Sequence, residues 1–261
     1  MDKLLCLDSI SLTYHTKKGE TLALDNLSID VQKNQFISIV GPSGCGKTTI
    51  LSIISGLIKP SKGNVTIEEE QVTKPSSKVG YMFQRDNLFE WLTIEKNVLL
   101  GLEIMHKKNK ETKEYAKALI KKYGLEEFSH SFPSELSGGM RQRTALIRTL
   151  ATKPEILLLD EPCSALDYQT RLLVQDDIKS IINEEQKTAI LVTHDISEAI
   201  SMSDKIIILS HRPGTVKKIV ELDFDKKLTP FERRSEPQFS KYFDMIWREL
   251  LWNTLLITKN I

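Results

Sequence analysis

The sequence has 261 residues, in which 36 lysines and arginines nearly balance 35 aspartates and glutamates. This length suits one large domain or two small ones, with enough chain to bury a core without disulfides. A formal net charge of +1 shows none of the basic excess that indicates a nucleic-acid partner. The three cysteines, Cys6, Cys45 and Cys163, do not form a disulfide framework and suit a reducing cytoplasm.

Neither a signal peptide nor a membrane helix is predicted. Asp8 interrupts the short apolar run at the start of the chain, which argues against a signal peptide. No window approaches the roughly 18 to 20 apolar residues that a membrane-spanning helix needs. We therefore expect a protein that is soluble, or peripheral to a membrane, on its own.

The first elements in chain order are predicted as strands. Residues 4–13 alternate weakly, as a half-buried strand does, and residues 22–31 resemble another strand. The run FISIV at residues 36–40 is continuously apolar and ends at a glycine, which is typical of a buried parallel strand. A helix over 47–57 and a turn come next, followed by short strands over 64–69 and 78–83.

The period then becomes helical over residues 95–124, where the charged stretch HKKNKETKE is expected to form a solvated helix face and its loop. Another helix is predicted over 141–152, and buried strands over 156–159, 189–192 and 205–209. Strands that alternate with helices indicate a parallel α/β sheet. The helix-only block from about 89 to 150 is then a helical subdomain inserted into that sheet.

The strongest single motif is GPSGCGKTT, which follows the buried strand and opens a helix. It has the spacing of a phosphate-binding loop, in which glycines aim backbone N–H groups at phosphates. Lys47 would neutralise the β- and γ-phosphate oxygens, and Thr48 would give its hydroxyl to Mg²⁺. A chance glycine-rich turn and a catalytic thiol at Cys45 are the alternatives. The predicted ATP-binding residues of the motif are Gly41, Pro42, Ser43, Gly44, Cys45, Gly46, Lys47, Thr48 and Thr49.

Three further positions follow strand-like runs. LLLDEP brings Asp160 and Glu161 to a strand end, where Asp160 would hold Mg²⁺ through its water shell and Glu161 would orient the attacking water. The alternative is a solvent-facing charge pair. His194, in LVTHD, is interpreted as a γ-phosphate sensor, although a lone histidine is more often a structural or surface residue. Gln84, in YMFQ, carries meaning only together with the other motifs.

The order of all these motifs, with LSGGMRQR at residues 136–143 and SALD at 164–167, resembles the ATP-binding subunit of ABC (ATP-binding cassette) transporters. The resemblance covers roughly residues 1–215. It implies a P-loop NTPase (RecA-like) α/β fold with a parallel-sheet core, an N-terminal antiparallel β subdomain and an inserted helical subdomain that carries the LSGG signature. It also implies an ATPase with Mg²⁺, in which Lys47, Gln84, Glu161 and His194 are catalytic, and Thr48, Gln84 and Asp160 bind the metal.

In that family two subunits pair head to tail, and the signature of one contacts the γ-phosphate held by the other. Ser137, Gly138 and Gly139 would supply these donors, which explains a glycine turn without a lysine. The alternative is an ordinary helix start with Ser137 as its cap. The resemblance also assigns Tyr14 to adenine stacking, against a plain strand aromatic, and Asp167 to a contact across the dimer.

Two stretches narrow the branch. FEWLTIEKNV at residues 89–98 and SHRPGTV at 210–216 resemble segments of bacterial importers for nitrate, sulfonates, taurine and thiamine-precursor pyrimidines, from which Phe89 and Glu90 depart slightly. The implied partners are two membrane-spanning permease subunits and, indirectly, an extracytoplasmic solute-binding protein. The implied location is the cytoplasmic face of the membrane. A non-transport ABC ATPase, an exporter or lipoprotein-release subunit, and an ATP-binding regulator without turnover are the rival interpretations.

We expect residues 1–215 to form the ATPase domain and 216–261 a C-terminal extension of a strand plus an amphipathic helix. The apolar residues of that helix, from Phe239 to Leu251, are expected to pack on the protein's own body or against a partner. The segment RDNLFEW at residues 85–91 exposes Leu88, Phe89 and Trp91 in a predicted loop. It is expected to line a groove for a helix of the membrane subunit, the alternative being that it packs under the helical block.

Overall fold

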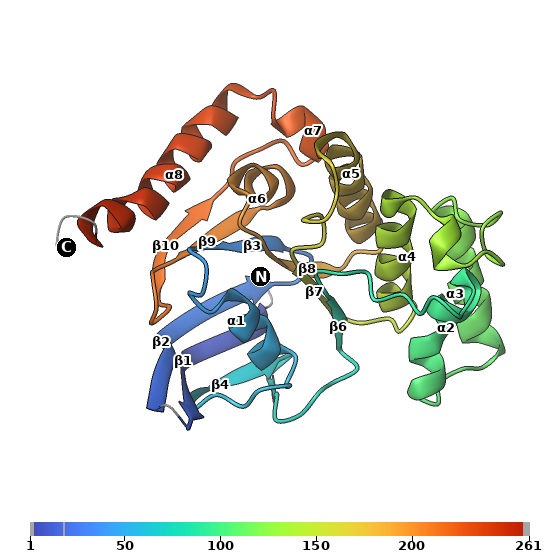
Figure 1. Ribbon diagram of the computed structural model, residues 1–261, viewed down its shortest axis with the longest axis horizontal. Coiled ribbons are helices and arrows are strands. Elements are labelled where there is room, and N and C mark those ends of the chain that lie inside the picture. The colour runs from blue at the N-terminus through green and yellow to red at the C-terminus, as the bar shows by residue number, and fades with distance from the viewer. Residues whose placement is uncertain (1–2, 18, 258–261) are drawn as a thin grey trace. The chain divides into compact units, whose positions relative to one another are not determined.

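The computed structural model describes residues 3–17 and 19–257, which fall into two compact units (Figure 1). Unit 1 consists of Met1–Ser76 and Thr188–Ile261, and unit 2 is Ser77–Lys187. Unit 2 is therefore wider than the predicted helical block of 89–150, since it also includes two strands and a long helix.

An antiparallel sheet begins unit 1. It contains β1 (Lys3–Thr16), β2 (Gly19–Gln32), β4 (Lys62–Ile67) and β5 (Glu70–Gln71), in the order β2-β1-β4-β5. Buried Leu5, Leu7 and Ile10 of β1 belong to its core. Both predicted N-terminal strands are confirmed, and each extends beyond its apolar centre because pairing along β1 and β2 continues through polar residues.

A second group of strands in unit 1 is mostly parallel. β3 (Phe36–Val40) pairs in parallel with β8 (Thr188–Val192) on one side and with β9 (Lys205–Leu209) on the other. Every residue of β3 and β8 is buried, as their continuous apolar runs predict. The carboxyl ends of these strands share an edge, and α1 (Lys47–Ile54) and α6 (Ile196–Met202) begin a few residues beyond β3 and β8.

The chain after residue 215 continues this part of unit 1. β10 (Val216–Glu221) pairs antiparallel with β9, and α7 (Pro230–Arg233) and α8 (Pro237–Ile257) follow (Figure 1). Ile246 of α8 is buried in a cluster with Val220 and Ala199, and Phe239 and Tyr242 pack against it. The helix therefore packs on the protein's own body, the first of the two predicted alternatives.

Unit 2 contains two parallel strands and several helices. The strands are β6 (Val79–Met82) and β7 (Ile156–Asp160), and the helices are α2 (Ile94–Ile104), α3 (Lys110–Lys122), the 3₁₀ turn η1 (Pro133–Glu135), α4 (Gly138–Leu150) and α5 (Tyr168–Glu184). The predicted helical stretch 95–124 is two helices, because Asn109 caps α3 and starts it anew. The charged run between them is exposed, as predicted.

Helix α4 is central to unit 2. It packs against α2, α3 and α5, and Ala145, Leu146, Ile147 and Leu150 on it are completely buried. Throughout the ranges that the structure describes, none of the helices combines the length and apolar character needed to cross a membrane.

Candidate functional site

The glycine-rich loop at residues 41–46 joins β3 to α1 in unit 1. Gly44 and Gly46 have φ values of +75° and +104°, a left-handed conformation that side chains disfavour. Lys47 is largely buried, and its Nζ donates hydrogen bonds to the carbonyls of Gly41 at 2.9 Å and Pro42 at 3.1 Å. The ammonium group therefore lies within the curl of the loop, next to the start of α1. This arrangement has the chemistry of an anion cradle and fits a phosphate group.

A second loop, residues 210–215, supports the phosphate loop from within unit 1. A Cβ atom on Gly214 would lie 2.1 Å from the carbonyl oxygen of Cys45, so only glycine allows this approach. Gly214 also donates its N–H to the carbonyl of Ala23 at 2.8 Å. The sequence identifies SHRPGTV as a segment typical of one family branch. It does not predict that the segment supports the phosphate loop, because Gly214 and Cys45 are far apart in the chain.

Cys45 is completely buried, and burial raises the pKa of its thiol above the ordinary value. A thiol held in this form is a poor nucleophile. The geometry therefore disfavours the alternative in which Cys45 acts as a catalytic thiol.

Two other predicted residues of unit 1 lie beside these elements. The hydroxyl of Tyr14 is hydrogen-bonded to that of Thr49, at 3.2 Å, so the aromatic ring is tied to the first turn of α1. His194 is exposed directly after β8. Asp195 then caps α6, with Oδ1 accepting from the N–H of Ser197 at 2.8 Å, which orders the backbone around the histidine.

The acidic pair lies at the end of β7 in unit 2. Asp160 is nearly buried and accepts a hydrogen bond from the hydroxyl of Tyr81 at 3.1 Å. Burial, reinforced by the charge of Asp160, raises the pKa of Tyr81, so the phenol remains a donor. Glu161 has a φ of +48°, a conformation rare outside glycine. The Glu161 carbonyl accepts two hydrogen bonds from Ser164, one from the N–H at 3.2 Å and one from the hydroxyl at 3.0 Å.

Gln84 follows β6 and lies next to this turn. Its Nε2 is 3.4 Å from Oε2 of Glu161 and 3.3 Å from Oγ of Ser164. These are long hydrogen bonds, and they bring two predicted catalytic residues together. The sequence did not single out Tyr81, whose only signal is its place in the strand that precedes Gln84. It included Ser164 as the first residue of SALD but did not predict its contact with Gln84.

The LSGG segment begins α4 in unit 2. Ser137 is the N-cap, and its Oγ accepts from the N–H of Met140 at 3.3 Å, as the capping alternative predicts. A Cβ on Gly138 would lie 2.9 Å from the side chain of Leu166, and one on Gly139 would lie 3.2 Å from that of Val174. The two glycines therefore also allow close packing at the start of α4, a role that the sequence did not reveal.

Asp167 of the SALD segment caps α5. Its Oδ1 accepts from the N–H of Thr170 at 3.0 Å, and hydrogen bonding to Thr170 lowers the pKa of Asp167 below the ordinary value. The carboxylate is therefore ionised and exposed at a helix start.

Within the described residues, no three side chains of His, Cys, Asp or Glu gather to hold a metal by themselves. Mg²⁺ suits such a chain, because this ion takes one or two protein oxygens and completes its shell with phosphate and water. The hydroxyl of Thr48 and the carboxylate of Asp160 are oxygen donors of the right class.

A groove of about 490 Å³ opens in unit 2 beside the loop that carries Gln84. Its apolar lining includes Val79, Phe83, Phe89, Leu100, Ile104 and Met105. The prediction that Leu88 is exposed with its aromatic neighbours is wrong, since Leu88 is only 7% exposed and belongs to the core. Trp91, in contrast, is 72% exposed, and its ring lies 4.9 Å from that of Phe89.

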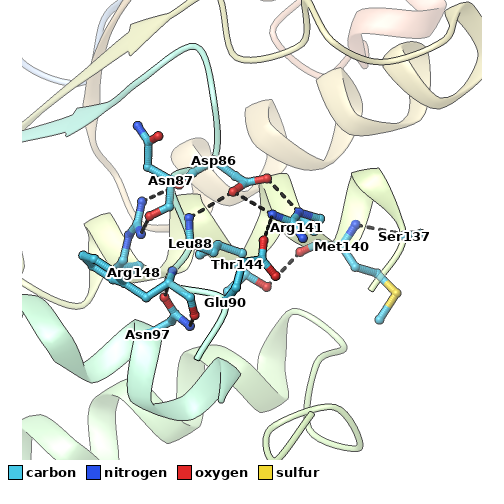
Figure 2. Close-up of polar contacts among 11 residues, drawn as sticks. Asp86, Asn87, Leu88, Glu90, Asn97, Ser137, Met140, Arg141, Thr144 and Arg148 are labelled. Carbon is cyan, nitrogen blue, oxygen red and sulfur yellow. Dashed lines mark hydrogen bonds and ion pairs between the residues drawn. The ribbon is translucent and has the colours of Figure 1, made fainter. Parts of the chain in front are cut away.

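The loop beside the groove is held by Asn97, a completely buried residue of α2 (Figure 2). Its Oδ1 accepts from the N–H of Phe89 at 2.8 Å, and its Nδ2 donates to the carbonyl of Phe89 at 3.1 Å and that of Leu92 at 3.0 Å. The aromatic pair is thus displayed on an ordered backbone.

Comparisons with known proteins identify the family of the chain. The family model described as "ABC transporter" matches residues 24–164. The chain is 49% identical over 247 residues to the "Uncharacterized ABC transporter ATP-binding protein YtlC" of Bacillus subtilis (strain 168), covering 94% of this chain and 95% of that protein. It is 41% identical to the "Aliphatic sulfonates import ATP-binding protein SsuB" of Bacillus cereus, covering 82% and 84%.

Among solved structures, the chain resembles the dimeric ATP-binding cassette MJ0796 in a post-hydrolysis state with ADP and Pi. The TM-score is 0.71 at 33% identity, over 85% of this chain and 100% of the other. This likeness confirms the predicted P-loop NTPase fold. Family match, relatives and fold agree with the phosphate loop that β3 and α1 form, and the chain therefore belongs to the ABC transporter family, as one of its ATP-binding, ATP-hydrolysing cassettes.

Proposed function

We propose that this cassette powers the import of a small solute, with aliphatic sulfonates as the first candidates, through two separate membrane subunits. Likeness to SsuB over most of the chain supports the solute class, and the WLT and RPG stretches support the same branch. Nitrate, taurine and pyrimidine-like precursors are the other solutes of that branch. The cassette would act at the cytoplasmic face of the membrane and receive solute indirectly from an extracytoplasmic binding protein.

The proposed ATP site assigns a task to each predicted residue. Gly41 to Thr49 bind the phosphates, with the charge of Lys47 at the β- and γ-groups and the ring of Tyr14 on adenine. Mg²⁺, when bound, would neutralise phosphate charge, and Thr48, Asp160 and Gln84 would hold it directly or through water. Glu161 orients and polarises the attacking water, and His194 contacts the γ-phosphate.

In the proposed dimer, Ser137, Gly138, Gly139 and Asp167 serve the nucleotide held by the partner chain. Dimeric structures of the MJ0796 cassette support such a pairing. Alternate closing and opening of this dimer would move the membrane subunits between two access states.

The observation that carries the transport assignment is the apolar groove next to Gln84. Its lining is largely aromatic and aliphatic, and the exposed pair Phe89 and Trp91 lies in the loop that borders the groove. An amphipathic helix that lays its apolar face into a groove is the matching mode of recognition. The proposed occupant is a cytoplasmic helix of the membrane subunit, because that subunit must respond to changes around Gln84 and Glu161. An exporter or non-transport ATPase is the alternative.

The experiment measures both solute class and docking. A strain that lacks this chain is complemented with the wild type, with Phe89→Ser or with Trp91→Ser, and uptake of a radiolabelled alkanesulfonate, taurine and nitrate is followed. Wild type should restore sulfonate uptake. Phe89 lines the groove and the ring of Trp91 lies beside that of Phe89, and the variants at these two residues are called the groove variants. Each should lower uptake by roughly tenfold or more, the scale of a lost aromatic anchor at an interface.

The purified groove variants should keep their fold and basal ATPase activity, because neither side chain is buried in the core. Phe231→Ser, which removes an exposed aromatic of unit 1 that does not line the groove, is the control and should support normal uptake. Unchanged uptake of all three solutes in the deletion strain would refute the importer assignment. Unfolding of both groove variants would instead show that the aromatics are part of the core.

A further inference from the structure

Two arginines on one face of α4 hold the 84–91 loop (Figure 2). Arg141 donates from Nε to Asp86 Oδ2 at 2.8 Å and from Nη2 to Asp86 Oδ1 at 3.2 Å, and a third hydrogen bond of 2.7 Å reaches Glu90. Arg148, two helical turns later, donates to the carbonyls of Asp86 at 2.6 Å and Asn87 at 2.7 Å. The loop that borders the groove is therefore attached to α4 at two levels.

The contact of Arg141 with Asp86 is stronger than an ordinary surface ion pair. The two side chains are 24% and 18% exposed, so water screens them only partly. Burial opposes ionisation of Asp86, yet the hydrogen bonds from Arg141 and from the N–H of Leu88 keep the pKa of Asp86 below its ordinary value. The geometry is bidentate, which adds directional specificity to the charge. Glu90, at 53% exposed, adds less.

Arg141 belongs to the turn that presents the LSGG residues. Its backbone N–H donates to the carbonyl of Ser137 at 3.0 Å, closing the first turn of α4. Gly138 and Gly139 in that turn have no side chains that could anchor it. Arg141 is thus the first residue after the glycines whose charged side chain attaches the turn to another segment.

We propose that Arg141 is a positioning residue that ties the first turn of α4 to the 84–91 loop, so that displacement of the loop is passed to Ser137, Gly138 and Gly139. The linkage is short, because Asp86 is two residues from Gln84 and three from Phe89. It runs through one bidentate ion pair and one helical turn. The inference rests on the proposed function, in which the groove receives a helix of the membrane subunit and the turn serves ATP hydrolysis.

The structure offers a matched pair of variants. Asp86 pairs with Arg141, and Asp177 of α5 pairs with Arg143, two residues further along the same helix. Both Asp→Asn changes remove a carboxylate that pairs with an arginine of α4, but only Asp86 lies in the loop beside the groove. Amide hydrogen exchange of the isolated full chain is measured at Met140, Arg141 and Gln142 in each variant.

Asp86→Asn should speed exchange at these amides by roughly tenfold or more, the scale of a lost charge-assisted hydrogen bond. Asp177→Asn should leave them within about twofold of the wild type, and exchange in α2 should change in neither. Arg141→Gln, which also loses the hydrogen bond to Glu90, should speed exchange at least as much as Asp86→Asn, and the double variant should add nothing to Arg141→Gln, since the ion pair is already lost. An equal response to the two Asp→Asn changes, or no response to Asp86→Asn, overturns the proposal.

Glu90→Gln serves as a second variant should Asp86→Asn fail to fold. It removes only the third hydrogen bond and should produce a smaller rise in the same amides; no rise overturns the proposal. ATPase assays of Asp86→Asn then separate the linkage through Arg141 from the proposed role of the LSGG turn in hydrolysis. A fall in kcat with little change in the ATP concentration for half-maximal rate supports both. Faster exchange with normal kcat upholds the linkage and refutes the proposed role of the turn in hydrolysis.

Discussion

Glu161 adopts a backbone conformation that few residues other than glycine tolerate, directly after the buried end of β7. Such strain persists where neighbouring contacts hold it, here the two hydrogen bonds from Ser164 to the Glu161 carbonyl. The result is that two adjacent carboxylates have different surroundings. Asp160 is nearly buried and bonded to Tyr81, whereas Glu161 is more accessible and lies next to Gln84.

Glu161→Gln tests the catalytic assignment at this scale. Glutamine keeps the shape of the side chain but cannot accept a proton, so ATP turnover should fall by at least ~10²-fold while ATP binding remains. With ATP and Mg²⁺, size-exclusion chromatography should show a trapped dimer. Glu155→Gln, a neutralised carboxylate just before the same strand, should keep wild-type turnover. A monomeric Glu161→Gln chain with near-native turnover would contradict the role.

The motif residues could be located from the sequence because each follows a buried apolar run, as Gly41 follows FISIV and Asp160 follows ILLL. Residues that support them could not be predicted in this way. Tyr81 meets Asp160, and Gly214 meets Cys45, through contacts between distant parts of the chain. A local pattern contains no information about which distant backbone or side chain comes close.

At the scale of elements, continuous apolar runs identified the buried strands, while helix boundaries were less predictable. The stretch 95–124 divides into α2 and α3 because a capping box starts α3. The Asn109 side chain accepts from the backbone N–H of Thr112, and the Thr112 hydroxyl accepts from the backbone N–H of Asn109. Leu88 was misjudged because a loop residue can be buried when its neighbours, here Asp86 and Phe89, are anchored to helices.

Glu185, just beyond α5, ties that helix to α3. Its carboxylate accepts from the hydroxyls of Tyr115 at 3.1 Å and Tyr123 at 2.7 Å, and from Nζ of Lys122 at 2.9 Å. Burial favours the neutral form, but the hydrogen bonds from Lys122 and Tyr123 outweigh it and lower the pKa of Glu185 below its ordinary value of 4.5. The stabilisation is therefore fully present above pH 4.5 and is lost as the pH falls through the folded-state pKa.

Glu185→Gln should lower the free energy of unfolding at pH 7 by roughly 1–3 kcal/mol, the scale of hydrogen bonds to a charged group. The difference from wild type should shrink at an acidic pH below 4.5, as the pH falls through the lowered pKa of the wild-type carboxylate. Urea unfolding at the two pH values measures it. Glu184→Gln, at a neighbouring and more exposed carboxylate, should cost less than about 1 kcal/mol. An equal loss at both pH values would show that charge is not the cause.

At the scale of the whole molecule, the two units carry different parts of the proposed chemistry. Unit 1 holds the phosphate loop with Lys47, and unit 2 holds the LSGG turn with Ser137. If the LSGG turn serves the nucleotide of a second copy, then a chain damaged in unit 1 and a chain damaged in unit 2 should together regain ATPase activity. This arrangement distinguishes a head-to-tail dimer from a self-sufficient monomer.

A mixture of Lys47→Ala and Ser137→Arg chains should regain ATPase activity that neither has alone. A mixed dimer has one site with both lesions and one intact site, built from Lys47 of one chain and Ser137 of the other. A Lys47→Ala chain mixed with a Lys47→Ala, Ser137→Arg double variant has no intact phosphate loop and should stay inactive. Mixed dimers that form but show no recovery would mean that the turn acts within its own chain.

The two buried cysteines lie in different units, Cys45 in unit 1 and Cys163 in unit 2. The thiolate attacks an alkylating reagent, which must therefore reach the sulfur, so neither cysteine can react until its surroundings open. The rate at which each cysteine is labelled therefore reports how readily its own unit opens locally. If nucleotide binds at the phosphate loop as proposed, it should stabilise the closed form of unit 1 and slow the labelling of Cys45.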